Sequence, residues 1–166
     1  KKTNLFNRAN RLRMNSEFDK AGTMFELFVY YKIKNSGLFD EARTGVNIKL
    51  KNETENEIDV IAKKGTRMVL ISCKTVADIS DNEWLNRAVY EVKSEAELLG
   101  AYPVIAIPHS ASELLKSNAG PNRAKNWGVS VLWKEQLTDD SKFREALKTI
   151  SEGKVFTVDK EERLNG

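Results

Sequence analysis

Cysteine, histidine and long apolar runs are nearly missing from this chain of 166 residues. The one cysteine, Cys73, excludes an internal disulfide and a cysteine cluster around zinc or iron–sulfur. The one histidine, His109, excludes a multi-histidine metal site, and we interpret it as a loop residue. No stretch approaches the roughly 20 apolar residues of a membrane helix, and no secretory signal or glycine-rich phosphate loop is found. We therefore expect a cytoplasmic protein that does not contact a membrane.

The basic residues are concentrated at the N-terminus. The net charge is +3, and residues 1–13 contribute +5 because they contain five basic residues and no acid, which leaves −2 for the remainder. We interpret residues 1–18 as a basic arm or interdomain linker and residues 19–166 as one domain, which is long enough to bury a hydrophobic core. Because the chain does not begin with methionine, we expect a fragment or a trimmed chain.

Hydrophobic periodicity predicts alternating helices and strands. The first helix is expected at 21–35, with an apolar face formed by Phe25, Phe28, Val29 and Ile33. The remaining elements expected are strands at 42–50, 57–62 and 67–75, a helix at 81–99, a strand at 103–107, a helical segment at 111–126 interrupted near Gly120, a strand at 129–133, a helix at 141–150 and an edge strand at 153–158. An antiparallel meander followed by alternating elements predicts an α/β fold, with a mixed central β-sheet flanked by helices.

Two neighbouring apolar strands carry charged residues, and a buried unpaired charge is costly. Asp59 lies on the first strand and Lys74 near the end of the second. A hairpin symmetric about Lys64-Gly65 would place Asp59 opposite Leu70 and Glu57 opposite Ser72. Glu57, Asp59, Ser72 and Lys74 would then share one face of the sheet, and a slip of one residue would separate them.

This group of residues suits a divalent metal and phosphodiester cleavage. Asp59 would bind Mg²⁺ or Mn²⁺ through oxygen, with the backbone carbonyl of Cys73 as a further ligand. Lys74 would orient the attacking water or stabilise the charge that develops on phosphorus. The alternative is a buried Asp59–Lys74 ion pair with a structural role only.

The segments Asn56-Glu57-Ile58-Asp59-Val60 and Ser72-Cys73-Lys74-Thr75 resemble the signature of the PD-(D/E)xK nuclease superfamily. They are most similar to the nuclease domain of CRISPR-ancillary effectors that carry a CARF sensor of cyclic nucleotides. The similarity covers about residues 20–140 and includes the later segments 122–124 and 128–131. The resemblance implies a restriction-endonuclease-like fold with a helix–three strands–helix–strand core.

The chain departs from that family at Ser72, where the family usually has glutamate. A hydroxyl is a poor replacement for a carboxylate on a hard cation. The substitute is either Glu57, a glutamate of the following helix (Glu83, Glu91 or Glu95), or no residue, in which case catalysis is weak or lost. Glu26 has two interpretations: it completes the metal site, as the resemblance implies, or it forms a capping box with Thr23 as the N-cap.

The resemblance implies an endonuclease for single-stranded RNA or DNA, a homodimer, and activation by a cyclic oligoadenylate bound to an upstream sensor domain. Two alternatives are a restriction-type or junction-resolving endonuclease for duplex DNA, and a nuclease-fold module that binds nucleic acid without cutting it. Trp84, Trp127 and Trp133 are interpreted as core or interface residues, with a base-stacking platform as the alternative.

Overall fold

The computed structural model describes residues 21–49, 55–75, 82–110 and 120–157. In chain order, the elements are α2 (Ala21–Ser36), β1 (Glu41–Lys49), β2 (Glu55–Lys64), β3 (Arg67–Cys73), α3 (Asn82–Leu99), β4 (Tyr102–Ala106), α5 (Gly120–Asn126), β5 (Ser130–Leu132), α6 (Lys134–Thr138) and α7 (Asp140–Ser151). Within these residues, no helix has the length and apolar character needed to cross a membrane. The expected basic arm and most of the helical segment at 111–126 lie outside the described residues.

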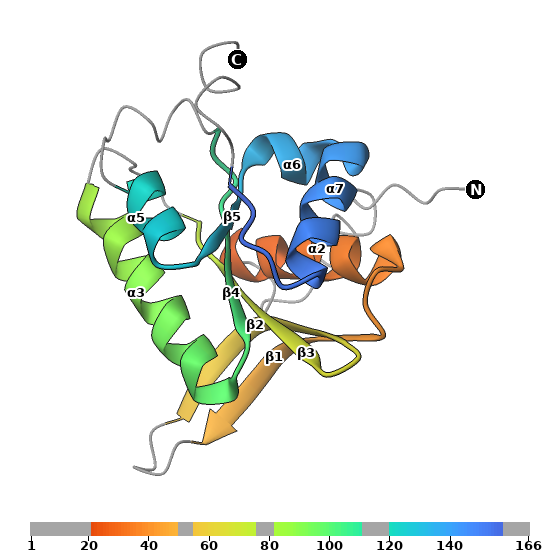
Figure 1. Ribbon diagram of the computed structural model, residues 1–166, viewed down its shortest axis with the longest axis horizontal. Coiled ribbons are helices and arrows are strands. Elements are labelled where there is room, and N and C mark those ends of the chain that lie inside the picture. The colour runs from red at the N-terminus through yellow and green to blue at the C-terminus, as the bar shows by residue number, and fades with distance from the viewer. Residues whose placement is uncertain (1–20, 50–54, 76–81, 111–119, 158–166) are drawn as a thin grey trace.

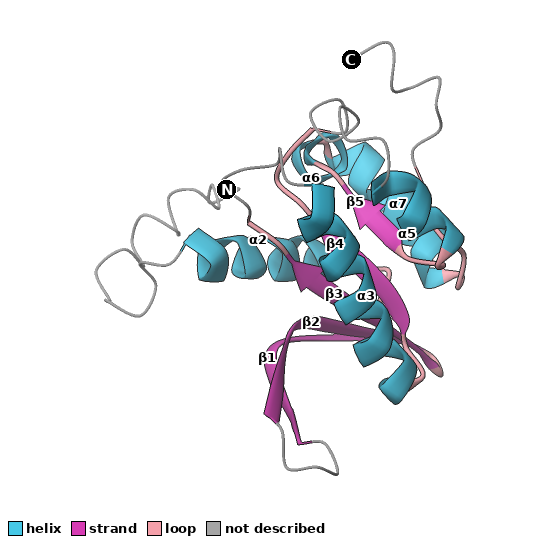
Figure 2. Ribbon diagram, turned by 90° about the vertical axis from the view of Figure 1, so that its left-hand side faces the viewer, coloured by secondary structure: helices cyan, strands magenta, loops and turns pink. Residues whose placement is uncertain are grey.

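The strands form one five-stranded sheet in the order β1-β2-β3-β4-β5. The β1–β2 and β2–β3 pairs are antiparallel, whereas β3–β4 and β4–β5 are parallel. The mixed sheet expected from the order of elements is therefore confirmed. Figure 2 shows the β1–β2 hairpin running out from the part of the sheet that the helices enclose.

Helices pack on both faces of the sheet and create two hydrophobic cores (Figure 1). Side chains alternate along a strand, so Leu70 of β3 joins one core while Val69 and Ile71 join the other. The first core contains buried residues of α3 and α5, and the second contains buried residues of α2, α6 and α7. The apolar face expected on the first helix is confirmed, because Val29 and Ile33 are fully buried in the second core.

The register of the β2–β3 hairpin differs from the prediction by two residues. Lys64 pairs with Arg67 and Ile61 pairs with Leu70, so Asp59 does not lie opposite Leu70. The loop consists of Gly65 and Thr66, and Gly65 adopts a φ of +58°, which glycine reaches without a steric penalty. Because a shift of two residues preserves the face on which each side chain lies, the predicted grouping does not depend on this error.

The C-terminal part of the sheet is smaller than expected. Residues 154–157 form no strand, and the backbone N–H of Phe156 donates to the hydroxyl of Ser130 instead of to a strand carbonyl. Residue 158 lies outside the described part of the chain. The short helix α6 was not expected from the sequence, and five residues are too few for a periodic pattern to be recognised.

Candidate active site

The candidate site lies where β2 and β3 separate. The last ladder pair between them is Val60–Ile71, whereas β2 remains paired with β1 as far as Glu55. Beyond that point, the backbone N–H of Cys73 donates to Oδ2 of Asp59 at 2.6 Å, so a side chain takes the place of a strand carbonyl. The carbonyl oxygen of Asp59 accepts from the hydroxyl of Thr44 at 2.8 Å, which fixes the backbone next to the carboxylate.

Asp59 experiences opposing electrostatic effects. Burial is the strongest, and it raises the pKa of Asp59 above its ordinary value. The Cys73 N–H, the positive charge of Lys74 and the hydroxyl of Ser72 lower that pKa, and Glu57 raises it. Ser72 is largely buried, and its hydroxyl donates to Oδ2 of Asp59 at 3.4 Å. The carboxylate is thus held by donors, but they do not fully compensate for its burial.

Lys74 follows the end of β3, and its backbone N–H donates to the carbonyl of Ala106 at 3.0 Å. Its Nζ lies 3.0 Å from Oε2 of Glu91 on α3, and about a third of the Lys74 side chain is exposed. The ion pair that Lys74 makes in the described chain is therefore with Glu91. The alternative of a closed Asp59–Lys74 pair is not observed, although the charge of Lys74 still influences Asp59.

Glu26 approaches the same site from α2. Burial raises the pKa of Glu26, and Asp59 and Glu57 raise it further. The capping-box interpretation is wrong, because α2 starts at Ala21 and Thr23 lies within the helix instead of preceding it. The N-terminal part of α2 lies close to the end of β3: a Cβ atom at Gly22 would be 3.7 Å from Oγ1 of Thr75. This approach brings Glu26 towards Asp59.

Glu57 is exposed and lies against β1. A Cβ atom at Gly45 would be only 3.4 Å from Oε1 of Glu57, and Gly45 has a φ of +62° in the middle of its strand. Glycine inside a strand is a recognised sign of a bend or a close approach. Gly45 was not identified as part of the site from the sequence, although this sign was available there.

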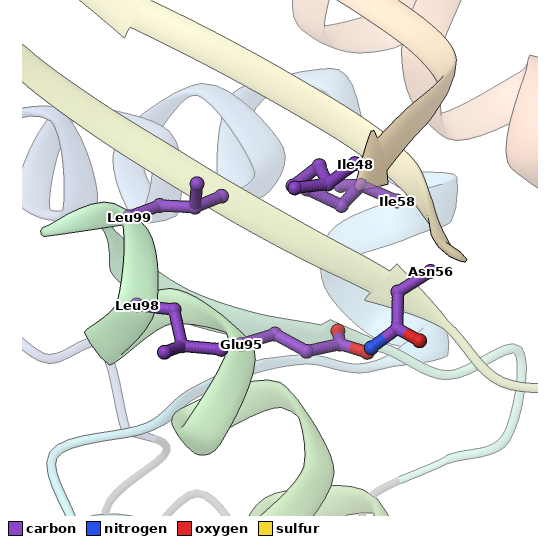
Figure 3. Close-up of a pocket in the computed structure, with 6 residues that line it drawn as sticks. All are labelled: Ile48, Asn56, Ile58, Glu95, Leu98 and Leu99. Carbon is purple, nitrogen blue, oxygen red and sulfur yellow. The ribbon is translucent and has the colours of Figure 1, made fainter. Parts of the chain in front are cut away.

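The glutamates of α3 differ in their positions. Glu95 is half-buried, and burial raises its pKa, with Lys74 lowering it and Asp59 and Glu91 raising it. Figure 3 shows its carboxylate directed towards the amide of Asn56, in a shallow pocket whose apolar wall comes from Ile48, Ile58, Leu98 and Leu99. Glu83 is exposed in the first turn of α3, about two helical turns before Glu91. Glu91 and Glu95 therefore lie nearer to Lys74 than Glu83 does.

Cys73 contributes its backbone and not its thiol. Burial raises the pKa of the Cys73 thiol well above its ordinary value, and Asp59 and Glu26 raise it further. A thiol that stays protonated is a poor nucleophile and a poor metal ligand. The expectation that Cys73 acts through a backbone group therefore agrees with its environment, although its role as a metal ligand stays a prediction.

The oxygen atoms at this site are of the type that a hard divalent cation binds. Asp59, Glu26 and Glu57 supply carboxylate oxygens, and mutual repulsion among these groups raises the pKa values of Asp59 and Glu26. A divalent cation would remove that repulsion. Within the described residues, the side chains as placed do not bring three histidine, cysteine, aspartate or glutamate groups around one point. Binding would therefore require rotation of the glutamate side chains towards Asp59.

Comparison with known proteins gives the family and the fold. The model of the family described as "Card1-like, endonuclease domain" matches residues 15–150. Similar solved structures include Can2 from Sulfobacillus thermosulfidooxidans in complex with cyclic tetra-adenylate, with a TM-score of 0.56 and 16% identity over 75% of this chain and 33% of that one. Protein VC1899 from Vibrio cholerae gives a TM-score of 0.62 and 19% identity over 83% of this chain and 36% of that one.

This chain spans about a third of the length of each of these two proteins, and identities this low show the fold alone. No curated protein matches the chain. The expected restriction-endonuclease-like fold is confirmed, and so is the resemblance to nuclease domains of CARF-containing effectors.

Proposed function

Since the chain belongs to the Card1-like endonuclease domain family, we propose that it is a metal-dependent endonuclease that cleaves single-stranded RNA or DNA. The single observation that carries the proposal is the position of Asp59. Its carboxylate lies where β2 and β3 part, next to the positive charge of Lys74 and to Glu26 on α2. One carboxylate and one ammonium group at the end of a sheet can serve phosphodiester hydrolysis without histidine.

In this proposal, Asp59 holds Mg²⁺ or Mn²⁺ together with the carbonyl of Cys73 and one or both of Glu26 and Glu57. A bound divalent cation would supply charge neutralisation and a more acidic water. Lys74 would donate a hydrogen bond to a phosphoryl oxygen or to the attacking water. Glu91 would hold the Lys74 ammonium in place until substrate phosphate competes for it, because their ion pair is partly exposed.

The wider assembly is proposed from the relatives. Can2 is described in complex with cyclic tetra-adenylate, and this chain spans a third of that protein. We propose that the complete protein carries an upstream sensor domain for a cyclic oligoadenylate, functions as a homodimer, and takes part in CRISPR-associated antiviral defence.

Two observations favour a second function. Ser72 has a hydroxyl where the family usually has a glutamate, and no three potential ligands converge in the described residues. A module that binds nucleic acid without cutting it would tolerate that loss. The two functions predict different results with the same substrates.

The test uses labelled single-stranded RNA, single-stranded DNA and duplex DNA with Mg²⁺ or Mn²⁺, and EDTA as the control. The proposed function predicts that the wild type cleaves at least one of the single-stranded substrates when metal is present. The Lys74→Ala variant should have the same thermal stability as the wild type and cleave none of them. Cleavage of duplex DNA alone would favour the restriction-type or junction-resolving alternative. Binding without cleavage by the wild type, at high protein concentration and with both metals, would favour the binding module.

A further inference from the structure

Two exposed aromatic side chains touch each other on the flank of α3 that faces α5. Tyr90 on α3 is 62% exposed and Trp127, directly after α5, is 37% exposed, whereas Trp133 is only 4% exposed. The rings of Tyr90 and Trp127 lie edge to face with centroids 6.1 Å apart. Figure 1 shows α3 and α5 side by side, and the two helices are in contact. Large exposed aromatic surface costs hydration free energy, so a contact pair of this kind favours a ligand.

The surroundings of this pair are cationic. The guanidinium of Arg123 lies over the Trp127 ring, 5.8 Å from its centroid. The sequence of α5, GPNRAKN, includes Arg123 and Lys125 and no acid. On α3, Glu91 and Glu97 are already engaged by Lys74 and Lys93, at 3.0 and 2.9 Å. An aromatic ring beside a guanidinium offers a base a stacking surface and offers its phosphate a positive charge.

We propose that Tyr90, Trp127 and Arg123 form a stacking subsite for one base of a single-stranded nucleic acid substrate. The proposal rests on the proposed function, because it takes the substrate class from there. Tyr90 precedes Glu91, the residue that pairs with Lys74, and consecutive residues of a helix project about 100° apart, so the subsite and the Lys74–Glu91 pair lie on different flanks of α3. A strand that leaves the active site across the exposed face of α3 meets Tyr90 before Trp127.

A second copy of the chain is the competing occupant. The exposed residues close to the pair in sequence are charged or polar: Arg87 and Glu91 on α3, and Arg123, Lys125 and Asn126 on α5. A dimer interface would require further apolar surface around the two rings to exclude water. A nucleobase needs only a ring face and a nearby cation, which is what this surface offers.

The test measures the dissociation constants of labelled single-stranded RNA and DNA by fluorescence anisotropy with the full chain in EDTA, which prevents cleavage. Trp127→Ala and Tyr90→Ala should each weaken binding about 5- to 100-fold, as expected for the loss of one stacked base. Trp127→Phe should stay within about threefold of the wild type, because a ring face is retained. Tyr102→Ala is the matched control, because Tyr102 is also exposed but starts β4, beyond the C-terminal end of α3.

A second set of strands carries one abasic nucleotide at successive positions. If a base stacks here, an abasic nucleotide at one position should weaken wild-type binding. At that position, the dissociation constants of the wild type and Trp127→Ala should become nearly equal. The subsite would be overturned if the dissociation constants of the wild type and Trp127→Ala differed by the same factor at every abasic position. It would also be overturned if Trp127→Ala and Tyr102→Ala weakened binding equally. If Trp127→Ala does not fold, the exposed Tyr90→Ala carries the same comparison.

Sedimentation velocity of the same variants tests the competing occupant. A loss of self-association in Tyr90→Ala with unchanged nucleic-acid binding would overturn the subsite in favour of a copy–copy interface. Failure of the subsite is distinguishable from failure of the proposed function. A wild type that binds and cleaves single strands while the variants behave like it refutes the subsite alone, whereas a wild type that neither binds nor cleaves refutes both.

Discussion

The backbone N–H of Cys73 donates a 2.6 Å hydrogen bond to Oδ2 of Asp59, across the point where two neighbouring strands part. The bond gives Asp59 a structural role in addition to the catalytic role proposed for it. A substitution at this position therefore has two effects that can be separated, one on folding and one on cleavage.

We expect Asp59→Asn to fold normally and to lose cleavage by about 100-fold or more. The asparagine carbonyl can still accept from the Cys73 N–H, and the charge penalty of burial is removed. Asp59→Ala should lose cleavage as well, and it should also lower the free energy of unfolding by about 1–3 kcal/mol, because a buried N–H loses its acceptor. Urea denaturation and cleavage rates of both variants check this. Equal stabilities of the two variants would contradict the structural role.

Lys74 and Glu91 form a partly exposed ion pair, and we expect only one of them to take part in the reaction. Glu91→Gln should change the free energy of unfolding by less than about 1 kcal/mol, as for other exposed pairs. It should leave cleavage within a few-fold of the wild type, whereas Lys74→Ala abolishes it. Cleavage rates at saturating and limiting substrate make the comparison. A loss in Glu91→Gln as large as in Lys74→Ala would place Glu91 in the metal site.

The sequence predicted which strands carry the site more accurately than it predicted the strand register and the helix contacts that assemble the site. The alternation of apolar and charged residues in 56–62 and 67–75 was enough to group Asp59 with Ser72 and Lys74. The hairpin turn was placed one residue early, at Lys64-Gly65 instead of Gly65-Thr66, because the charges of Lys64 and Arg67 gave no indication of where pairing starts. The contact of Lys74 with Glu91 spans 17 residues and depends on the rotation of α3, which helical periodicity defines only approximately.

Gly45→Ala tests whether the close approach of β1 to Glu57 positions that carboxylate. Gly45→Ala should lower the free energy of unfolding by about 1–2 kcal/mol, because alanine is strained at a φ of +62°. The matched control is Gly37→Ala, at a φ of +67° with no atom within 4 Å of the added Cβ. Both variants carry the same backbone penalty, but only in Gly45→Ala does the added Cβ contact the carboxylate of Glu57. Cleavage should therefore fall further in Gly45→Ala, and equal cleavage in the two variants would remove Glu57 from the site.

Glu26 and Glu57 both repel the carboxylate of Asp59, and this repulsion should destabilise the metal-free protein. Glu26→Gln and Glu57→Gln should each raise the melting temperature in EDTA by about 1–3 °C. Each should also reduce the increase in melting temperature that Mn²⁺ produces, and each should lower cleavage. A full Mn²⁺ shift in either variant would show that its carboxylate does not bind the metal. If both keep the full shift, Glu91 and Glu95 of α3 are the remaining candidates.

Ser72 is the position at which a carboxylate can be added back. Its hydroxyl lies 3.4 Å from Oδ2 of Asp59, so Ser72→Glu would place a second carboxylate beside the first. In EDTA, we expect this variant to melt at a lower temperature than the wild type, because two partly buried carboxylates repel each other. With Mn²⁺, the shift in melting temperature should exceed that of the wild type, and cleavage should be equal or faster.

Ser72→Ala provides the control, because it removes the hydroxyl without adding charge. The loss of one hydrogen bond should cost about 0.5–1.5 kcal/mol, and the shift with Mn²⁺ should stay as in the wild type. A larger Mn²⁺ shift in Ser72→Glu but not in Ser72→Ala would mean that the cation lies within reach of position 72. If Ser72→Glu gains nothing from Mn²⁺, the cation does not bind within reach of position 72, because an added carboxylate ligand would strengthen its binding.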